Sequence, residues 1–106
     1  MRAGNAAPVF AALGDETRLH LVARLGREGP LSIAKLTERT TITRQAVAKH
    51  LRVLEGAGVV ASSRDGRESV WTLETKRLED ARAHLDVISR QWDDTLERLR
   101  LFVEED

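Results

Sequence analysis

The chain of 106 residues contains no cysteine. Disulfide bonds, thiolate metal sites and thiol redox switches are therefore excluded. The sequence also lacks an apolar run close to the roughly 18 residues that a membrane-spanning helix needs. Its weakly apolar start, MRAGNAAPVF, has no pattern of a targeting peptide. These absences predict a soluble cytoplasmic protein without a membrane segment.

Catalytic motifs are absent as well. The three histidines, His20, His50 and His84, fall on three separate predicted helices, and none has a nucleophile at a suitable spacing. The glycines form neither a phosphate-binding loop nor a dinucleotide-binding fingerprint. The chain is long enough for one small domain, residues 1–106, and too short for a separate catalytic domain. We expect no enzyme activity and no cofactor.

The charge of the chain is unevenly distributed, although its formal net charge is zero. Residues 43–77 carry seven Lys/Arg against four Asp/Glu (net +3), whereas residues 78–106 carry four against nine (net −5). A basic middle and an acidic end indicate a surface divided between a DNA face and a face for a partner or solvent. The acidic run alone is more typical of a solvated helix.

The most informative stretch, residues 43–71, begins with a predicted helix. Thr43 supplies an N-cap oxygen, and Gly56 ends the helix. One apolar stripe, formed by Val47, Leu51 and Leu54, recurs at helical spacing. At about 100° per residue, the opposite face is polar and basic. This face carries Gln45, Lys49 and Arg52, with Arg44 and Ala48 on its flank. Such a helix suits the major groove of DNA.

A basic β-hairpin is predicted directly after this helix. Residues 59–60 open a β-type run, Asp65-Gly66 is a tight-turn signal, and residues 70–73 form the return strand. Arg64 and Arg67 bracket the tip. The predicted fold is therefore mainly α with a small β-hairpin, which is a winged helix-turn-helix of five helices and a two-stranded wing.

The other helices follow from their caps and apolar spacing. The first is expected from Asn5 to Leu13, with Pro8 in its first turn or at a kink. Asp15 should cap the second and Ser32 the third, which should end at Thr40. The last is expected from about Thr75 to Val103, and one small domain cannot bury so long an apolar stripe. We therefore predict that segments 5–14 and 75–103 form a dimer interface. Its expected residues are Val9, Phe10, Leu13, Leu85, Ile88, Trp92, Leu96, Leu99 and Phe102.

Three segments together resemble the ArsR family of winged-helix transcriptional repressors. They are FAALGDETRLHLVARL, LSIAKLTERTTITRQAVAKHLRVLEGAGVV and SSRDGRESVWTL, and the similarity spans roughly residues 8 to 75. The resemblance implies a homodimer that binds a palindromic operator and represses transcription. It also implies that the first and last helices form the dimer interface.

The sequence departs from the metal-sensing members of that family. Their thiolate ligands would fall within Leu31 to Thr37, which contains none. Other members use a carboxylate and histidines in the last helix. The nearest counterparts here are His84 and Asp86, followed by Asp93, Asp94 and Glu97. With a single imidazole among them, we expect no functional metal site.

The predicted DNA contacts divide into two kinds. Gln45 and Lys49 are expected to read base edges. Phosphate contacts are expected from Thr41, Thr43, Arg44 and Arg52, and contacts to the neighbouring backbone or minor groove from Arg64 and Arg67. His50 fits either a phosphate contact or packing. The function predicted is a homodimeric repressor of its own or a neighbouring operon. The alternative is a winged-helix protein-interaction module that uses its acidic last helix.

Overall fold

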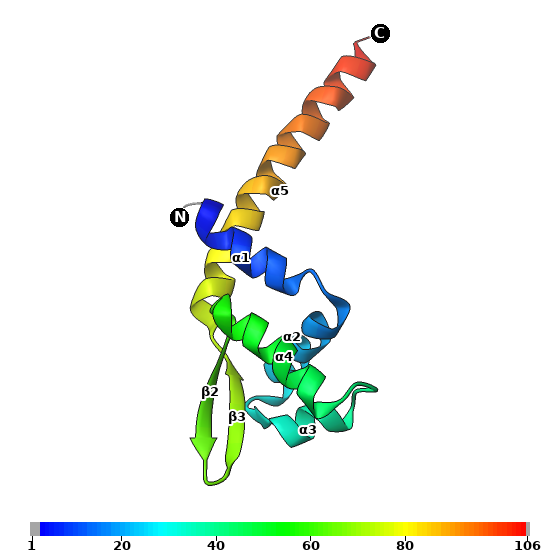
Figure 1. Cartoon of the computed structure of the whole chain (residues 1–106). Helices are drawn as coiled ribbons and strands as arrows, with labels where there is room; N and C mark the ends of the chain where they lie inside the picture. The colour runs from blue at the N-terminus through cyan, green and yellow to red at the C-terminus, as the bar shows by residue number, and fades with distance from the viewer. Residues whose placement is uncertain (1–2, 106) are drawn as a thin grey trace.

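The computed structural model describes residues 3–105. Within this range five helices and three strands follow one another along the chain (Figure 1). They are α1 (Ala3–Leu13), α2 (Glu16–Glu28), β1 (Leu31–Ser32), α3 (Ile33–Glu38), α4 (Arg44–Gly56), β2 (Val60–Asp65), β3 (Glu68–Leu73) and α5 (Thr75–Glu104). The predicted fold class, a mainly α winged helix-turn-helix, is confirmed.

Side-chain caps start three helices where the sequence predicts them. Each cap oxygen accepts a backbone N–H that the first turn leaves free. The pairs are Asp15 with Arg18 at 3.0 Å, Ser32 with Lys35 at 3.2 Å, and Thr43 with Ala46 at 3.1 Å. The first helix differs from its prediction because it begins at Ala3 rather than Asn5. Pro8 therefore lies beyond the first turn, where its missing N–H removes one helical hydrogen bond.

The sheet has one strand more than the predicted two-stranded wing. Its order is β1-β3-β2, and both pairings are antiparallel. The hairpin of β2 and β3 pairs Asp65 with Glu68, so its two-residue loop is Gly66-Arg67, one position later than expected. Gly66 adopts φ +65°, which the first position of such a loop favours. The added strand pairs Leu31 with Trp71. A strand of two residues is too short to show a period in the sequence.

The core lies where α4 packs against the other elements. The predicted stripe of Val47, Leu51 and Leu54 has no exposed surface at all. Around it pack apolar residues from α1, α2, α3 and the sheet, among them Leu21, Leu36, Val60 and Trp71. Burial of one such side chain contributes about 1.5–3 kcal/mol. The orientation of α4 is therefore determined by its buried face, and its polar face is left for solvent or a ligand.

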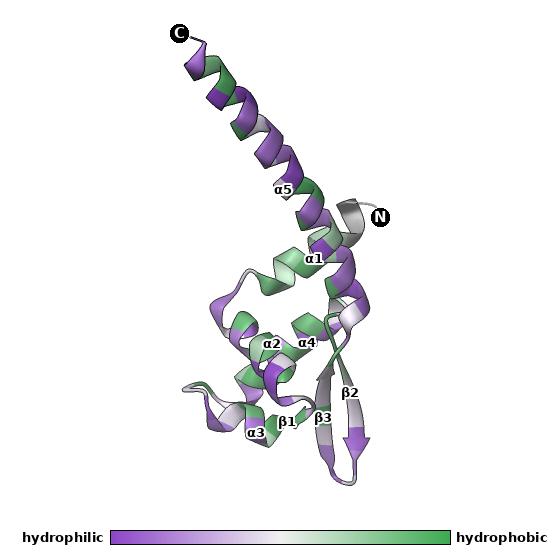
Figure 2. Cartoon of the chain, turned by 180° about the vertical axis from the view of Figure 1, so that it is seen from behind, coloured by the Kyte–Doolittle hydropathy of each residue, from purple (hydrophilic) through white to green (hydrophobic). Residues whose placement is uncertain are grey.

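Helix α5 runs from the wing past α1 and then away from the rest of the protein, which gives the molecule extents of 68 × 29 × 20 Å (Figure 1). Its first part packs against α1, where the rings of Phe10 and His84 lie 6.3 Å apart. Beyond that contact its apolar side chains are exposed, including Trp92 at 60% and Phe102 at 70%. Figure 2 shows hydrophobic residues recurring along this outer part of the helix. None of the helices in the described residues is long and apolar enough to cross a membrane.

The residues predicted at the dimer interface differ in their exposure to solvent. Leu85, Trp92, Leu96, Leu99 and Phe102 are exposed, and Phe10, Leu13 and Ile88 are half-buried. Val9 differs because it is fully buried within the protomer. It belongs to the cluster that holds α1 on the core, so it has no surface to offer a partner.

Candidate nucleic-acid interface

The exposed face of α4 carries the side chains that the sequence predicts for DNA. Arg44, Gln45, Lys49 and Arg52 are all exposed, as is the capping residue Thr43. Part of this face is hollowed. The hollow is lined by Thr43, Gln45, Ala46, Lys49 and Arg52. The structure therefore brings the two predicted base-reading residues together with two predicted phosphate contacts on one concave, cationic surface.

The wing lies beside α4 and projects away from the outer end of α5 (Figure 1). Arg64 and Arg67 are exposed near its tip. Arg67 lies in the two-residue loop, and Arg64 lies in β2, two residues before the loop. The wing is also tied to α4, because the hydroxyl of Ser62 donates to Glu55 Oε2 at 3.1 Å. That contact was not predicted from the sequence. It restrains the base of the hairpin relative to the helix, so that the arginines and the α4 face are presented together.

Thr41 and His50 lie apart from this hollow. Thr41 is exposed in the turn between α3 and α4. His50 points to the start of α2, where its Nδ1 lies 3.2 Å from Arg18 Nη1 and 3.9 Å from Asp15 Oδ2. Of the two interpretations left open by the sequence, these contacts favour packing. His50 links the helix that carries the polar face to the cap of α2.

Two arginines that the sequence analysis did not single out hold the helices in place. Arg18 donates from Nε to the carbonyl of Ala12, and its Nη1 lies within hydrogen-bond distance of His50 Nδ1. Arg24 donates to the carbonyls of Lys35 and Leu36 at 3.1 and 3.2 Å. Such donors satisfy carbonyls that helix ends leave free. No sequence signal distinguishes them from solvated arginines, because their acceptors are backbone atoms distant along the chain.

The capping hydrogen bond at the start of α2 also lowers the pKa of Asp15. The backbone N–H of Arg18 hydrogen-bonds the carboxylate of Asp15 and lowers its pKa below the ordinary value of 3.8, and the nearby charges of Arg18 and His50 act in the same direction. A hydrogen bond to the charged form favours ionisation. Asp15 therefore stays ionised at neutral pH and keeps its capping bond.

The acidic residues and the histidine of the last helix do not form a metal-binding cluster. In residues 3–105, no three side chains of His, Cys, Asp or Glu are close enough together to hold a metal ion. His84 instead packs its ring against Phe10.

Comparison with known sequences agrees with this geometry. A helix-turn-helix domain family matches residues 13–63. The transcriptional regulator YuzN of Bacillus subtilis is 41% identical, over 73% of this chain and 90% of that protein. The transcriptional repressor SmtB of Mycobacterium tuberculosis is 30% identical, over 86% of this chain and 65% of that protein. These relatives are regulators of transcription rather than enzymes.

Solved structures give the same result. An ArsR-like transcriptional regulator from Rhodococcus superposes with a TM-score of 0.76 at 36% identity, covering 93% of this chain and 92% of that one. A homodimeric winged helix-turn-helix DNA-binding domain from Mycobacterium bovis shares the fold, with a TM-score of 0.66 at 19% identity over 83% of this chain and 81% of that one. The chain belongs to the ArsR family of winged helix-turn-helix transcriptional regulators.

Proposed function

We propose that this protein is a homodimeric repressor that binds a palindromic operator in double-stranded DNA. The observation that carries the proposal is the concave surface of Thr43, Gln45, Lys49 and Arg52 on a helix whose opposite face is completely buried. A rigidly held helix with a polar, cationic face is what major-groove recognition requires.

Within this surface, two residues suit base edges. Gln45 and Lys49 are spaced i and i+4, so they lie on one side of α4 about one turn apart. Lysine suits the O6 and N7 atoms of guanine, and glutamine suits the N6 and N7 atoms of adenine. The remaining cations, Arg44 and Arg52, flank them and suit phosphates, while the wing arginines reach the adjacent backbone or minor groove.

Dimerisation supplies the symmetry of the operator. The exposed apolar residues of α5 would be costly to leave in water, and a second copy of the chain can cover them. A twofold dimer presents two α4 helices to two half-sites, so the operator is expected to be a palindrome. The relatives support this assembly and activity, since SmtB is named a repressor and the Mycobacterium bovis domain is described as homodimeric.

The test begins with selection of DNA fragments from the source genome by purified protein. Fluorescence anisotropy then compares a selected duplex with a scrambled duplex of the same composition at two salt concentrations. We expect a Kd of about 10⁻⁸–10⁻¹¹ M for the selected duplex, at least about a thousandfold tighter than for the scrambled one. The affinity for both should fall as salt rises. Equal, weak binding to both duplexes would contradict the proposal and favour the protein-interaction alternative.

A further inference from the structure

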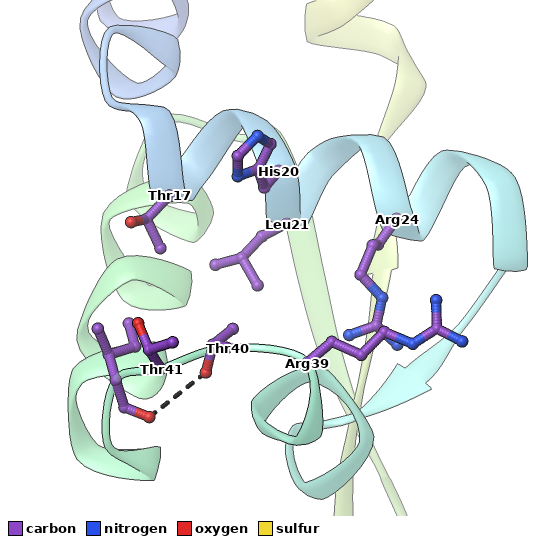
Figure 3. A pocket seen from close by; sticks show the side chains of 8 residues that line it. Thr17, His20, Leu21, Arg24, Arg39, Thr40 and Thr41 are labelled. Atoms are coloured by element: carbon purple, nitrogen blue, oxygen red, sulfur yellow. Dashed lines mark hydrogen bonds between the residues drawn. The ribbon is translucent and has the colours of Figure 1, made fainter.

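A second hollow lies on the other side of the turn that leads into α4. It has a volume of about 220 Å³ and lies between α2 and residues 39–42 (Figure 3). Its lining residues are Thr17, His20, Leu21, Arg24, Arg39, Thr40, Thr41 and Ile42. It shares no lining residue with the concave face of α4. We refer to it as the turn pocket.

The turn pocket combines an apolar wall with cationic and hydroxyl groups. Half-buried Ile42 supplies apolar surface, above a floor formed by Leu21, which is itself only 1% exposed. His20, Arg24 and Arg39 supply nitrogen donors, and no carboxylate is among the lining residues. Figure 3 draws Arg24 and Arg39 at the same end of the pocket. A small ligand site with this composition would accept a molecule that has one anionic end and one apolar end.

The two arginines differ in how far they are already satisfied. Arg24 is committed to Glu28 at 3.0 Å and to the carbonyls of Lys35 and Leu36. Arg39 is exposed, and among residues 3–105 its guanidinium forms neither an ion pair nor a hydrogen bond, although its charge acts on the nearby carboxylate of Glu28, which Arg24 binds. The planar group of Arg39 can bind a carboxylate through two parallel hydrogen bonds. Arg39 is therefore the main hydrogen-bond donor that the pocket offers to an anion.

The wall of the pocket is continuous with the start of α4. The hydroxyl of Thr40 donates to the carbonyls of Thr37 and Ile42, which holds the turn closed. Thr43, the next residue after Ile42, caps α4 through its hydroxyl. A ligand that contacts Arg39, Thr41 and Ile42 therefore touches the segment that sets the position of the first turn of α4. Gln45, a predicted base contact, lies in that first turn.

We propose that the turn pocket binds a small organic carboxylate with an apolar body, and that its occupation changes the affinity for the operator. The second part rests on the proposed function. A ligand changes DNA affinity only if it binds the free and DNA-bound forms differently. The turn is where the two sites adjoin. A backbone phosphate of DNA would use the cations but has no need of Ile42, so the apolar wall favours the small molecule.

The first experiment needs no DNA. ¹H–¹⁵N NMR spectra of the full chain are titrated with sodium benzoate at constant ionic strength, and separately with neutral benzamide and with inorganic phosphate. We expect saturable benzoate shifts at residues 17–24 and 39–42, and at least about tenfold weaker binding of the two other probes, which lack the charge or the apolar ring. Absence of saturable benzoate shifts, or equal binding of benzamide, would overturn the proposal.

Matched variants locate the site. Arg39→Gln should weaken benzoate binding about tenfold, because it removes the charge and the paired donors. Arg27→Gln is the control, since Arg27 is an exposed arginine on α2 outside the pocket. Its benzoate affinity should stay within about twofold of the wild type. The amide spectra of both variants report directly that they are folded. An equal loss in the two variants would show that benzoate follows surface charge alone.

The second experiment measures anisotropy of the selected operator with and without saturating benzoate. We expect the wild-type Kd to change at least about fivefold, the low end of allosteric couplings, and the Arg39→Gln value to be insensitive to benzoate. An unchanged wild-type Kd would overturn the regulatory half. A large loss of DNA affinity in Arg39→Gln without benzoate would reassign the pocket to a DNA phosphate. If no duplex binds at all, the proposed function fails, while the benzoate titration still decides whether the pocket is a ligand site.

Discussion

Gln45 and Lys49 line the concave face of α4 and Arg67 lies at the wing tip, so the three residues should differ in what their loss does to DNA binding. Gln45→Ala or Lys49→Ala should cost about 1–3 kcal/mol on the selected operator and much less on a scrambled duplex. Arg67→Ala should weaken binding to both duplexes alike, and it should reduce the slope of log K against log salt concentration by about one. Anisotropy titrations on both duplexes at several salt concentrations measure these effects.

Arg90→Ala is the matched control, because Arg90 is an exposed arginine on α5 far along the chain from α4 and the wing. It should leave both affinities nearly unchanged. If the Gln45 and Lys49 variants lost equal affinity for the two duplexes, these side chains would hold phosphates, and the base-reading face would have to be placed elsewhere on α4.

The ionised cap of α2 predicts a stability that depends on pH. The folded-state pKa of Asp15 lies below the ordinary value of 3.8, so this contribution is complete above that value and is lost as pH falls through the lower, folded-state pKa. Asp15→Asn keeps a capping oxygen but removes the charge. Compared with the wild type, its stability should fall less steeply as pH drops below about 3.8. Urea unfolding followed by circular dichroism at several pH values tests this, and identical pH profiles would contradict it.

At the scale of elements, the sequence predicts the helices best where a side chain caps them. Asp15, Ser32 and Thr43 each mark a helix start to the residue, because capping is a local interaction between neighbours in the sequence. The third strand could not be predicted, since Leu31 and Ser32 are held by pairing with a strand about 40 residues away. Local chemistry is readable in a sequence, whereas pairing between distant segments is not.

The same distinction explains the outcome at the candidate site. The polar face of α4 follows from helical spacing within one element. The turn pocket escaped the sequence analysis because His20 and Arg39 lie on different elements and converge only in the fold. Val9 was misassigned for a related reason. An apolar stripe on a helix does not state whether its own core or a partner covers it, and for Val9 it is the core.

Two glycines near the end of α4 should respond oppositely to the same substitution. Gly58 adopts φ +78°, and a Cβ there would lie 2.9 Å from Cγ of Arg77. Gly58→Ala should therefore lower the free energy of unfolding by about 1–2 kcal/mol. Gly56 is helical, and a Cβ there meets nothing within 4 Å. Gly56→Ala should raise the free energy of unfolding by about 0.4–1 kcal/mol. Urea denaturation of both variants decides the matter, and effects of the same sign would contradict this account of the helix end.

For the whole molecule, the lack of cysteine, together with the lack of a ligand cluster among residues 3–105, predicts that metals do not control DNA binding directly. Zinc, nickel or arsenite at stoichiometric concentration should leave the preformed protein–DNA complex intact. Anisotropy under chelator-controlled conditions measures this. Specific dissociation by one metal, abolished in His84→Ala, would establish the metal sensor that the sequence argues against.

The exposed apolar stripe on the outer part of α5 predicts that the protein forms a dimer. Trp92 is 60% exposed and lies on the same stripe as Leu85, Leu96 and Leu99, which are each more than half exposed. If a second copy covers this stripe, light scattering should give twice the chain mass of 11.8 kDa at micromolar concentration. Trp92→Glu would place an unpaired charge in that interface and should yield a folded monomer.

Val87→Glu is the control that separates a specific interface from a general effect of charge on α5. Val87 is 43% exposed and precedes Trp92 by five residues, which puts it about 140° around the helix from the stripe. The Val87→Glu variant should remain a dimer with an unchanged circular dichroism spectrum. Among residues 3–105, the first part of α5 packs against α1 and contributes Leu78 and Ala81 to the core, whereas the outer part is exposed. A monomeric Trp92→Glu variant should therefore also show a less protected outer α5 in hydrogen exchange. A wild-type monomer, or equal dissociation of both variants, would mean that the stripe is not the specific contact between protomers.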